Sequence, residues 1–119
     1  MMIENFNTSL IKFLKVLSDP VRLKIIEYLH ENPSFPSDIQ KELNLSQSYT
    51  SHQLKKLTEV GIVTYKRLVK NKEFKIKNKK IFKLISIIKS YIFQSEKAKF
   101  QEIKSLEQDT SIPDFKDLF

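Results

Sequence analysis

The sequence lacks cysteine altogether and contains a single glycine in 119 residues. Without cysteine there is no disulfide framework, no thiolate metal site and no cysteine nucleophile, and the chain suits a reducing cytoplasm. One glycine and four prolines are a poor supply for the many turns of a β-sandwich or barrel but are sufficient for helices. The composition therefore favours one mostly α domain with a single modest core.

Features typical of enzymes, metalloproteins and membrane proteins are also missing. There is no glycine-rich phosphate loop and no acidic pair beside a histidine, so the sequence predicts neither catalysis nor a cofactor. The two histidines, His30 and His52, fall on different expected helices without the spacing of metal ligands, so no metal site is predicted. The apolar stretch 81–93 is about half a membrane span, and residues 1–10 do not resemble a secretion signal.

Charge, in contrast, is abundant and unevenly placed. Lysine and arginine number 21 against 14 acidic residues, for a net charge of +7. Residues 62–99 hold twelve basic and two acidic side chains, residues 1–61 hold seven of each, and residues 100–119 hold two basic and five acidic ones. A basic excess confined to one stretch predicts a polyanionic partner for that stretch.

Local signals predict two helices at the start of the chain. Apolar residues recur at steps of three and four from Ile3 to Leu17, which is typical of an amphipathic helix. Asp19 is a suitable N-cap and Pro20 a suitable first residue for a second helix. That helix is expected to stop at Asn32 and Pro33.

Two shorter helices joined by a tight turn are expected next. Residues 34–36 are predicted to be an extended linker, and Ser37 is expected to cap a helix that runs through residue 43. Ser46 is expected to cap a helix over residues 47–60, which ends at Gly61, the one glycine of the chain. This pair of helices predicts a helix-turn-helix, whose second helix reads base edges in the major groove of DNA.

The rest of the chain predicts a hairpin, a last helix and a tail. Residues 62–68 and 72–77 are rich in β-branched, aromatic and basic residues, which favours a two-stranded wing. A final helix begins near Lys79 with more apolar surface than one packing face requires. The predicted organisation is a winged-helix DNA-binding and dimerisation domain over residues 1–104 and an acidic, flexible tail over residues 105–119.

The expected recognition helix has two unlike faces. Thr50, Leu54 and Leu57 fall on the core face, and polar residues fall on the other. Small hydroxyls let the start of the helix approach a DNA backbone closely, glutamine can address adenine, and histidine and lysine can meet phosphate or guanine. The residues of this helix and of the wing that are expected to contact DNA are Ser46, Gln47, Ser48, Tyr49, Ser51, His52, Lys55, Lys66, Arg67, Lys70 and Lys72.

Other interpretations stay open from the residues alone. The polar face of residues 47–55 is also what an ordinary solvated helix presents, and Tyr49 could pack against the preceding helix instead of touching DNA. A lysine-rich wing also suits an architectural protein that coats DNA through phosphates alone. A winged helix that docks another protein is the third possibility, and the basic charge speaks against it.

Three stretches resemble the ArsR/SmtB family of winged-helix repressors: LSDPVRLKII at 17–26, LSQSYTSHQLKKL at 45–57 and GIV at 61–63. The resemblance spans about residues 10–95 and implies about five helices with a two-stranded wing. It also implies DNA contacts by Gln47, Ser48, Ser51 and His52. Phe35 and Ser37 stand where metal-sensing members of the family carry a pair of cysteines, so the resemblance does not extend to their metal site.

The resemblance further implies a homodimer built from the first and last helices, which agrees with the apolar excess of the last helix. The residues expected at the interface are Phe6, Leu10, Phe13, Leu84, Ile85, Ile88, Tyr91 and Ile92. A two-fold dimer would place two recognition helices roughly 34 Å apart, which predicts an inverted-repeat site. The sequence thus predicts a cytoplasmic, nucleoid-associated regulator of transcription, a repressor that binds specific double-stranded DNA without a metal.

Overall fold

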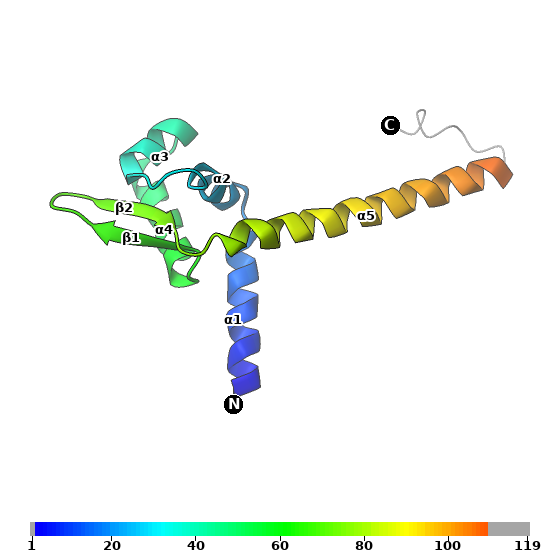
Figure 1. The fold of residues 1–119 in the computed structure, drawn as a ribbon, viewed down its shortest axis with the longest axis horizontal. Coiled ribbons are helices and arrows are strands. Elements are labelled where there is room, and N and C mark those ends of the chain that lie inside the picture. The colour runs from blue at the N-terminus through cyan, green and yellow to red at the C-terminus, as the bar shows by residue number, and fades with distance from the viewer. Residues whose placement is uncertain (1, 110–119) are drawn as a thin grey trace. The chain divides into compact units, whose positions relative to one another are not determined.

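The computed structural model describes residues 2–109 and divides the chain into two compact units, Met1–Lys79 and Lys80–Phe119. The first unit contains four helices, α1 (Met2–Leu17), α2 (Pro20–Tyr28), α3 (Pro36–Leu43) and α4 (Gln47–Glu59), followed by the strands β1 (Val63–Arg67) and β2 (Lys72–Ile76). The second unit is the helix α5 (Lys80–Asp109). The predicted mostly α architecture, a helix-turn-helix followed by a wing, is confirmed (Figure 1).

The predicted caps of α2 and α4 are confirmed. Asp19 accepts a hydrogen bond at its Oδ2 from the Arg22 backbone N–H at 3.0 Å, and Pro20 is the first residue of α2. The Ser46 hydroxyl accepts one from the Tyr49 backbone N–H at 3.2 Å. Gly61 follows the end of α4 with a φ of +77°, the left-handed conformation for which glycine is preferred because it has no Cβ.

Several predicted helix boundaries are wrong, and α4, predicted over residues 47–60, ends at Glu59. Helix α3 begins at Pro36, with Phe35 as N-cap and without a side-chain cap, so Ser37 lies in its first turn and does not cap it. Proline is itself a favourable first helical residue, and it keeps the residue before it extended, which moves the boundary one residue earlier. Helix α2 ends at Tyr28, ahead of the Asn32 and Pro33 that were expected to stop it.

The core of the first unit forms where α2, α3 and α4 meet. The inner face of α4 is buried as predicted, with Thr50, Leu54 and Leu57 almost without solvent exposure. Thr50 donates its hydroxyl to the Ser46 carbonyl at 2.8 Å, which satisfies a polar group that would otherwise be costly to bury. Leu23 of α2, in contrast, is exposed. The apolar side chains that complete this core are Val16, Leu17, Ile25, Ile26, Leu29, Ile39, Ile62, Val63, Phe74 and Ile76.

The wing is an antiparallel hairpin whose register places Val63 opposite Ile76 and Tyr65 opposite Phe74. Its loop, residues 68–71, is closed by the Leu68 backbone N–H, which donates to the Asn71 carbonyl at 2.7 Å. Phe74 also exchanges two backbone hydrogen bonds with Ser34, at 2.8 and 2.9 Å. This bridge, which the sequence did not predict, fixes the wing to the segment just before α3.

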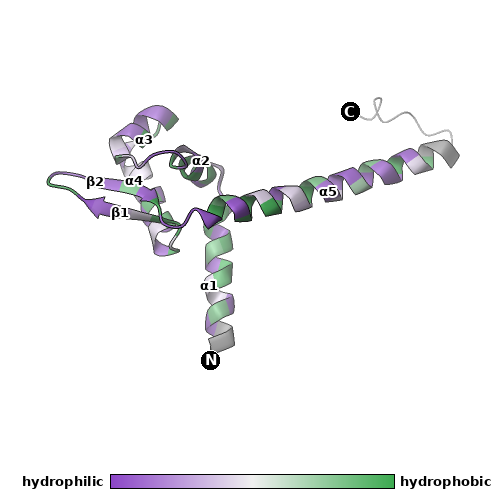
Figure 2. Ribbon diagram, in the orientation of Figure 1, coloured by the Kyte–Doolittle hydropathy of each residue, from purple (hydrophilic) through white to green (hydrophobic). Residues whose placement is uncertain are grey.

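Helix α5 is longer than predicted. The sequence placed a flexible tail from Ser105, but the helix continues to Asp109, because residues 105–109 contain neither proline nor glycine to stop it. The remainder of the predicted tail lies outside the described residues, and the division at residue 104 stays a prediction. Apolar residues are concentrated in the first half of α5 (Figure 2). None of the described helices is sufficiently long and apolar to span a membrane.

Candidate nucleic-acid interface

The outer face of α4 is open to solvent. Every predicted contact residue on this helix is exposed, including Tyr49, whose side chain keeps 39% of its accessible surface. The hydroxyl of Ser46 caps the helix, so this residue has a structural role as well. A row of exposed hydroxyl, amide, imidazole and ammonium groups supplies both donors and acceptors for a polar partner. The residues in this row are Gln47, Ser48, Ser51, His52 and Lys55.

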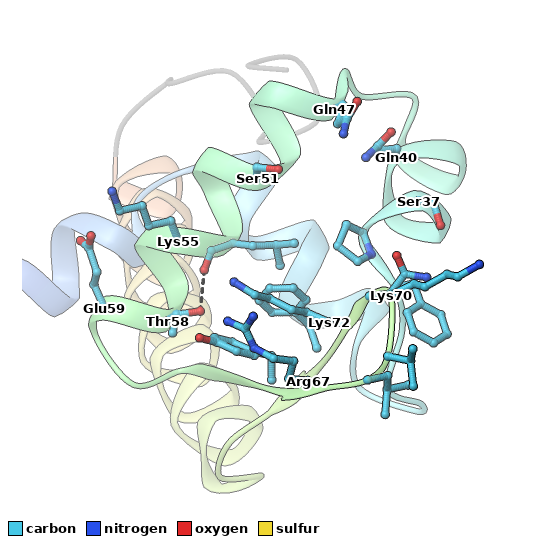
Figure 3. Close-up of a pocket in the computed structure, with 18 residues that line it drawn as sticks. Ser37, Gln40, Gln47, Ser51, Lys55, Thr58, Glu59, Arg67, Lys70 and Lys72 are labelled. Atoms are coloured by element: carbon cyan, nitrogen blue, oxygen red, sulfur yellow. Dashed lines mark hydrogen bonds between the residues drawn. The ribbon is translucent and has the colours of Figure 1, made fainter.

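A groove of about 830 Å³ separates α4 from the wing. The start of α3 forms one end of it, the outer side of α4 one wall, and the face of the wing that carries Tyr65 and Phe74 the other wall (Figure 3). Leu54 also lines it, and its carbonyl accepts a hydrogen bond from the Thr58 hydroxyl at 2.8 Å. The lining is mixed, because apolar side chains such as Leu54, Val69 and Phe74 stand among the polar and charged ones.

The groove brings together about half of the predicted DNA-contact residues. Those that line it are Gln47, Ser51, Lys55, Arg67, Lys70 and Lys72. Those that do not are Ser46, Ser48, Tyr49, His52 and Lys66. Lys66 is directly opposite Glu73, and because side chains alternate along a strand both point away from the groove.

The wing places like charges next to each other along this groove. Arg67 and Lys72 are directly opposite each other in the hairpin, an arrangement that is unfavourable without an anion between or above the two groups. A cation–π contact offsets part of this repulsion, because the Lys72 Nζ lies 4.6 Å from the centre of the Tyr65 ring. Tyr65 in turn packs on Phe74, with ring centres 5.3 Å apart. The paired aromatic rings thus support a fixed cationic site that faces α4.

Sequence reasoning missed the part of the groove that α3 contributes. Phe35, Pro36 and Ser37 line its end, and Gln40 points toward Gln47 (Figure 3). The proline at the start of α3 was the available signal, because it fixes where the helix begins and hence which residues face α4. Tyr65 was also missed as a groove residue, although its alternation with Arg67 along one strand places both side chains on the same face.

Both helices predicted to form a dimer carry exposed apolar side chains. On α1, Phe6 and Leu10 are 69% and 46% exposed, while Phe13 is half-buried. On α5, Ile85 is half-buried, and the exposed side chains of the predicted interface are Leu84, Ile88, Tyr91 and Ile92. Apolar faces of this extent are typical of surfaces that a partner covers.

The described residues contain no group of three or more histidine, cysteine, aspartate or glutamate side chains that could hold a metal ion. Both histidines are exposed. His52 belongs to the outer face of α4, and His30 follows α2, where it donates its backbone N–H to the Glu27 carbonyl at 3.1 Å.

Comparison with known proteins identifies the family. The model of the bacterial regulatory protein arsR family matches residues 19–65. The cadmium resistance transcriptional regulatory protein CadC of Listeria innocua is 39% identical over 85 residues, which cover 70% of this chain and 71% of CadC. The chain belongs to the ArsR family. It is therefore a DNA-binding transcriptional regulator with a winged helix-turn-helix and not an enzyme, as predicted.

One further relative of this ArsR-family chain and one solved structure of the same fold extend the comparison. The biofilm growth-associated repressor of Xylella fastidiosa is 30% identical over 84 residues, which cover 71% of this chain and 74% of the repressor. The homodimeric winged helix-turn-helix DNA-binding domain Mb0332 of Mycobacterium bovis has the same fold, with a TM-score of 0.69 and 17% identity over 77% of this chain and 88% of that domain.

Proposed function

We propose that this protein is a homodimeric repressor that binds an inverted repeat in double-stranded DNA. The observation that carries the proposal is the groove in which the polar face of α4 meets the cationic face of the wing. Lys55 contributes from the helix, and Arg67 and Lys72 contribute from the strands. Such a protein would act on the nucleoid in the cytoplasm.

Helix α4 would lie in the major groove, where Gln47, Ser48, Ser51 and His52 reach the base edges. Gln47 and Ser48 are the first two residues after the cap, and the free N–H groups of a first helical turn attract phosphate. Ser51 and His52 lie one turn further along, on the same exposed side. The four side chains would read the bases, and Tyr49 would contact a sugar or a thymine methyl beside them.

The wing would hold the sugar-phosphate backbone that flanks the bases read by α4. The Arg67 and Lys72 pair is opposed across the hairpin, so a phosphate that enters the groove relieves the repulsion between them. Lys70 in the loop would reach the next phosphate or the minor groove. Because phosphate contacts carry no sequence information, this half of the interface would supply affinity and α4 would supply specificity.

The groove-facing charges of the wing provide the direct test. Replacing Arg67 and Lys72 with glutamine is expected to weaken binding to every duplex alike. The slope of log K against log salt should fall by about 0.9 for each lost phosphate contact. Fluorescence anisotropy with a labelled duplex at several salt concentrations measures both quantities.

Lys75 and Lys77 supply a matched control, because both are exposed and alternate with the buried Ile76. Replacing these two residues with glutamine removes the same charge from the outer face of the wing. The control is expected to keep most of the wild-type salt slope. If affinity and salt slope fell equally in the two double variants, the net charge of the protein, and not the groove, would hold the DNA.

We also propose that the signal for this regulator is not a thiophilic metal. The relative CadC is named for cadmium resistance, but this chain has no cysteine and two histidines, so it cannot assemble a thiolate site. Micromolar Cd²⁺ or Zn²⁺ is expected to leave the DNA affinity unchanged in the anisotropy assay. Release of the duplex at those concentrations, reversed by a chelator, would contradict this proposal.

A further inference from the structure

One side chain, Arg22 of α2, connects the end of α1 to the recognition helix. Its Nε donates to the Val16 carbonyl at 2.6 Å, and its Nη2 donates to the Lys15 carbonyl at 3.3 Å. Its Nη1 donates to Oε1 of Gln53, on α4, at 2.7 Å. The planar guanidinium can hold these three acceptors at once because its donors diverge in a fixed geometry.

The end of α1 explains why this contact is needed. Helix α1 ends at Leu17, and the carbonyls in the last turn of a helix have no N–H partner further along the same helix. Residue 20, four positions after Val16, is a proline without an N–H and already belongs to α2. Arg22 supplies a donor to the Val16 carbonyl and also places a positive charge at the C-terminal end of the α1 dipole. A side chain from α2 thus satisfies a carbonyl that the backbone of α1 leaves open.

Gln53 explains how the contact reaches α4. Its side chain is only 4% exposed, and it lies on α4 between the buried Thr50 and the buried Leu57, facing away from the DNA-contact row. A buried amide oxygen needs a donor, and Arg22 provides a charged one. The guanidinium is therefore a three-point clamp between the carbonyl end of α1 and the inner face of the recognition helix.

We propose that Arg22 is a positioning residue that sets the angle between α1 and α4 and so fixes the spacing of DNA half-sites that the dimer accepts. This inference rests on the proposed function, in which α1 contributes to the dimer interface and α4 reads the bases. A dimer whose recognition helices are fixed to its interface helices tolerates one half-site spacing. A dimer in which that connection is loose tolerates several.

Gln53→Leu tests the clamp without touching the DNA-facing side chains, because it removes the acceptor and keeps an apolar side chain of similar size. The bond is already present in the free protein, so operator affinity is expected to fall only by the cost of holding the loosened helices in the bound arrangement, at most roughly tenfold to hundredfold for one hydrogen bond to a charged group. The ratio of the affinity for the correct half-site spacing to the affinity for a spacing changed by one base pair is expected to fall toward one. Gln53→Glu, which keeps an oxygen for Arg22 to donate to, is expected to restore both the affinity and the spacing preference.

Two measurements on the protein without DNA complete the test. The Arg22 Nε–H is expected to exchange slowly with solvent by NMR in the wild type. Thermal unfolding shows whether Gln53→Leu remains folded. A folded Gln53→Leu variant with wild-type affinity and wild-type spacing preference would overturn the clamp, as would rapid exchange of the Arg22 Nε–H in the wild type.

The outcome for the clamp can be separated from that for the proposed function. If the wild type binds duplex DNA without any preference for half-site spacing, the proposed dimeric repressor is overturned. Slow exchange of the Arg22 Nε–H that becomes fast in Gln53→Leu would then still support the clamp as a connection between α1 and α4.

Discussion

Replacing Ile88 with glutamate is expected to convert the protein from a dimer to a monomer and to abolish operator binding at nanomolar concentrations. Ile88 lies on the apolar side of α5 and is 39% exposed in the single chain. A two-fold interface repeats every change, so the variant buries two carboxylates without partners. An unpaired buried charge costs about 3–5 kcal/mol, which corresponds to a dimer at least a hundredfold weaker. Sedimentation or light scattering across a concentration series measures this loss.

Ser90→Glu is the matched control for Ile88→Glu. It adds the same carboxylate to the same helix two residues away, about 200° around the helix axis from Ile88. Ser90 is exposed, so this variant is expected to dimerise and bind DNA like the wild type. A dimer that survives Ile88→Glu, or one that both variants break equally, would exclude the apolar side of α5 as the interface.

Replacing Gln47 and Ser51 together with alanine is expected to remove most of the preference for the operator over random DNA. Each lost base contact costs about 1–3 kcal/mol on the cognate site. Both side chains are exposed, so the substitutions should leave the core and the wing unchanged. Competition binding with a labelled operator and unlabelled random duplex measures the ratio of the two affinities.

Random duplex is the internal control for this double variant. Its affinity depends on phosphate contacts, which the variant keeps, so it is expected to stay within about twofold of wild type. If the affinities for operator and for random duplex fell by the same factor, α4 would not read sequence. The architectural interpretation, in which the protein coats DNA through phosphates alone, would then be preferred.

The sequence predicted most of the helix ends that depend on local chemistry. Asp19, Ser46 and Gly61 each act within a few residues of their own position, so the residue type and its neighbours are sufficient to assign the role. Pro36 and Ser37 show the limit of such signals. Both are typical of a helix start, and α3 begins at Pro36 because proline suits the first helical position and keeps Phe35 extended.

Contacts between distant segments could not be predicted in the same way. The Ser34 bridge to Phe74 and the Arg22 bond to Gln53 join residues that are 40 and 31 positions apart, and no periodicity reveals which partners meet. The residues that line the groove were predicted only in part for the same reason. The basic residues of the wing were evident, whereas the contribution of Gln40 depends on how α3 docks on α4.

Selection of DNA from a random duplex pool, at about 150 mM salt so that weak charge contacts are screened, tests the central claim most directly. The expected result is an inverted repeat whose half-sites lie one helical turn apart, because a two-fold dimer presents two copies of α4 to one face of the duplex. Enrichment of nothing beyond length or A·T content would contradict a sequence-reading repressor. Recovery of a single half-site would contradict the dimer.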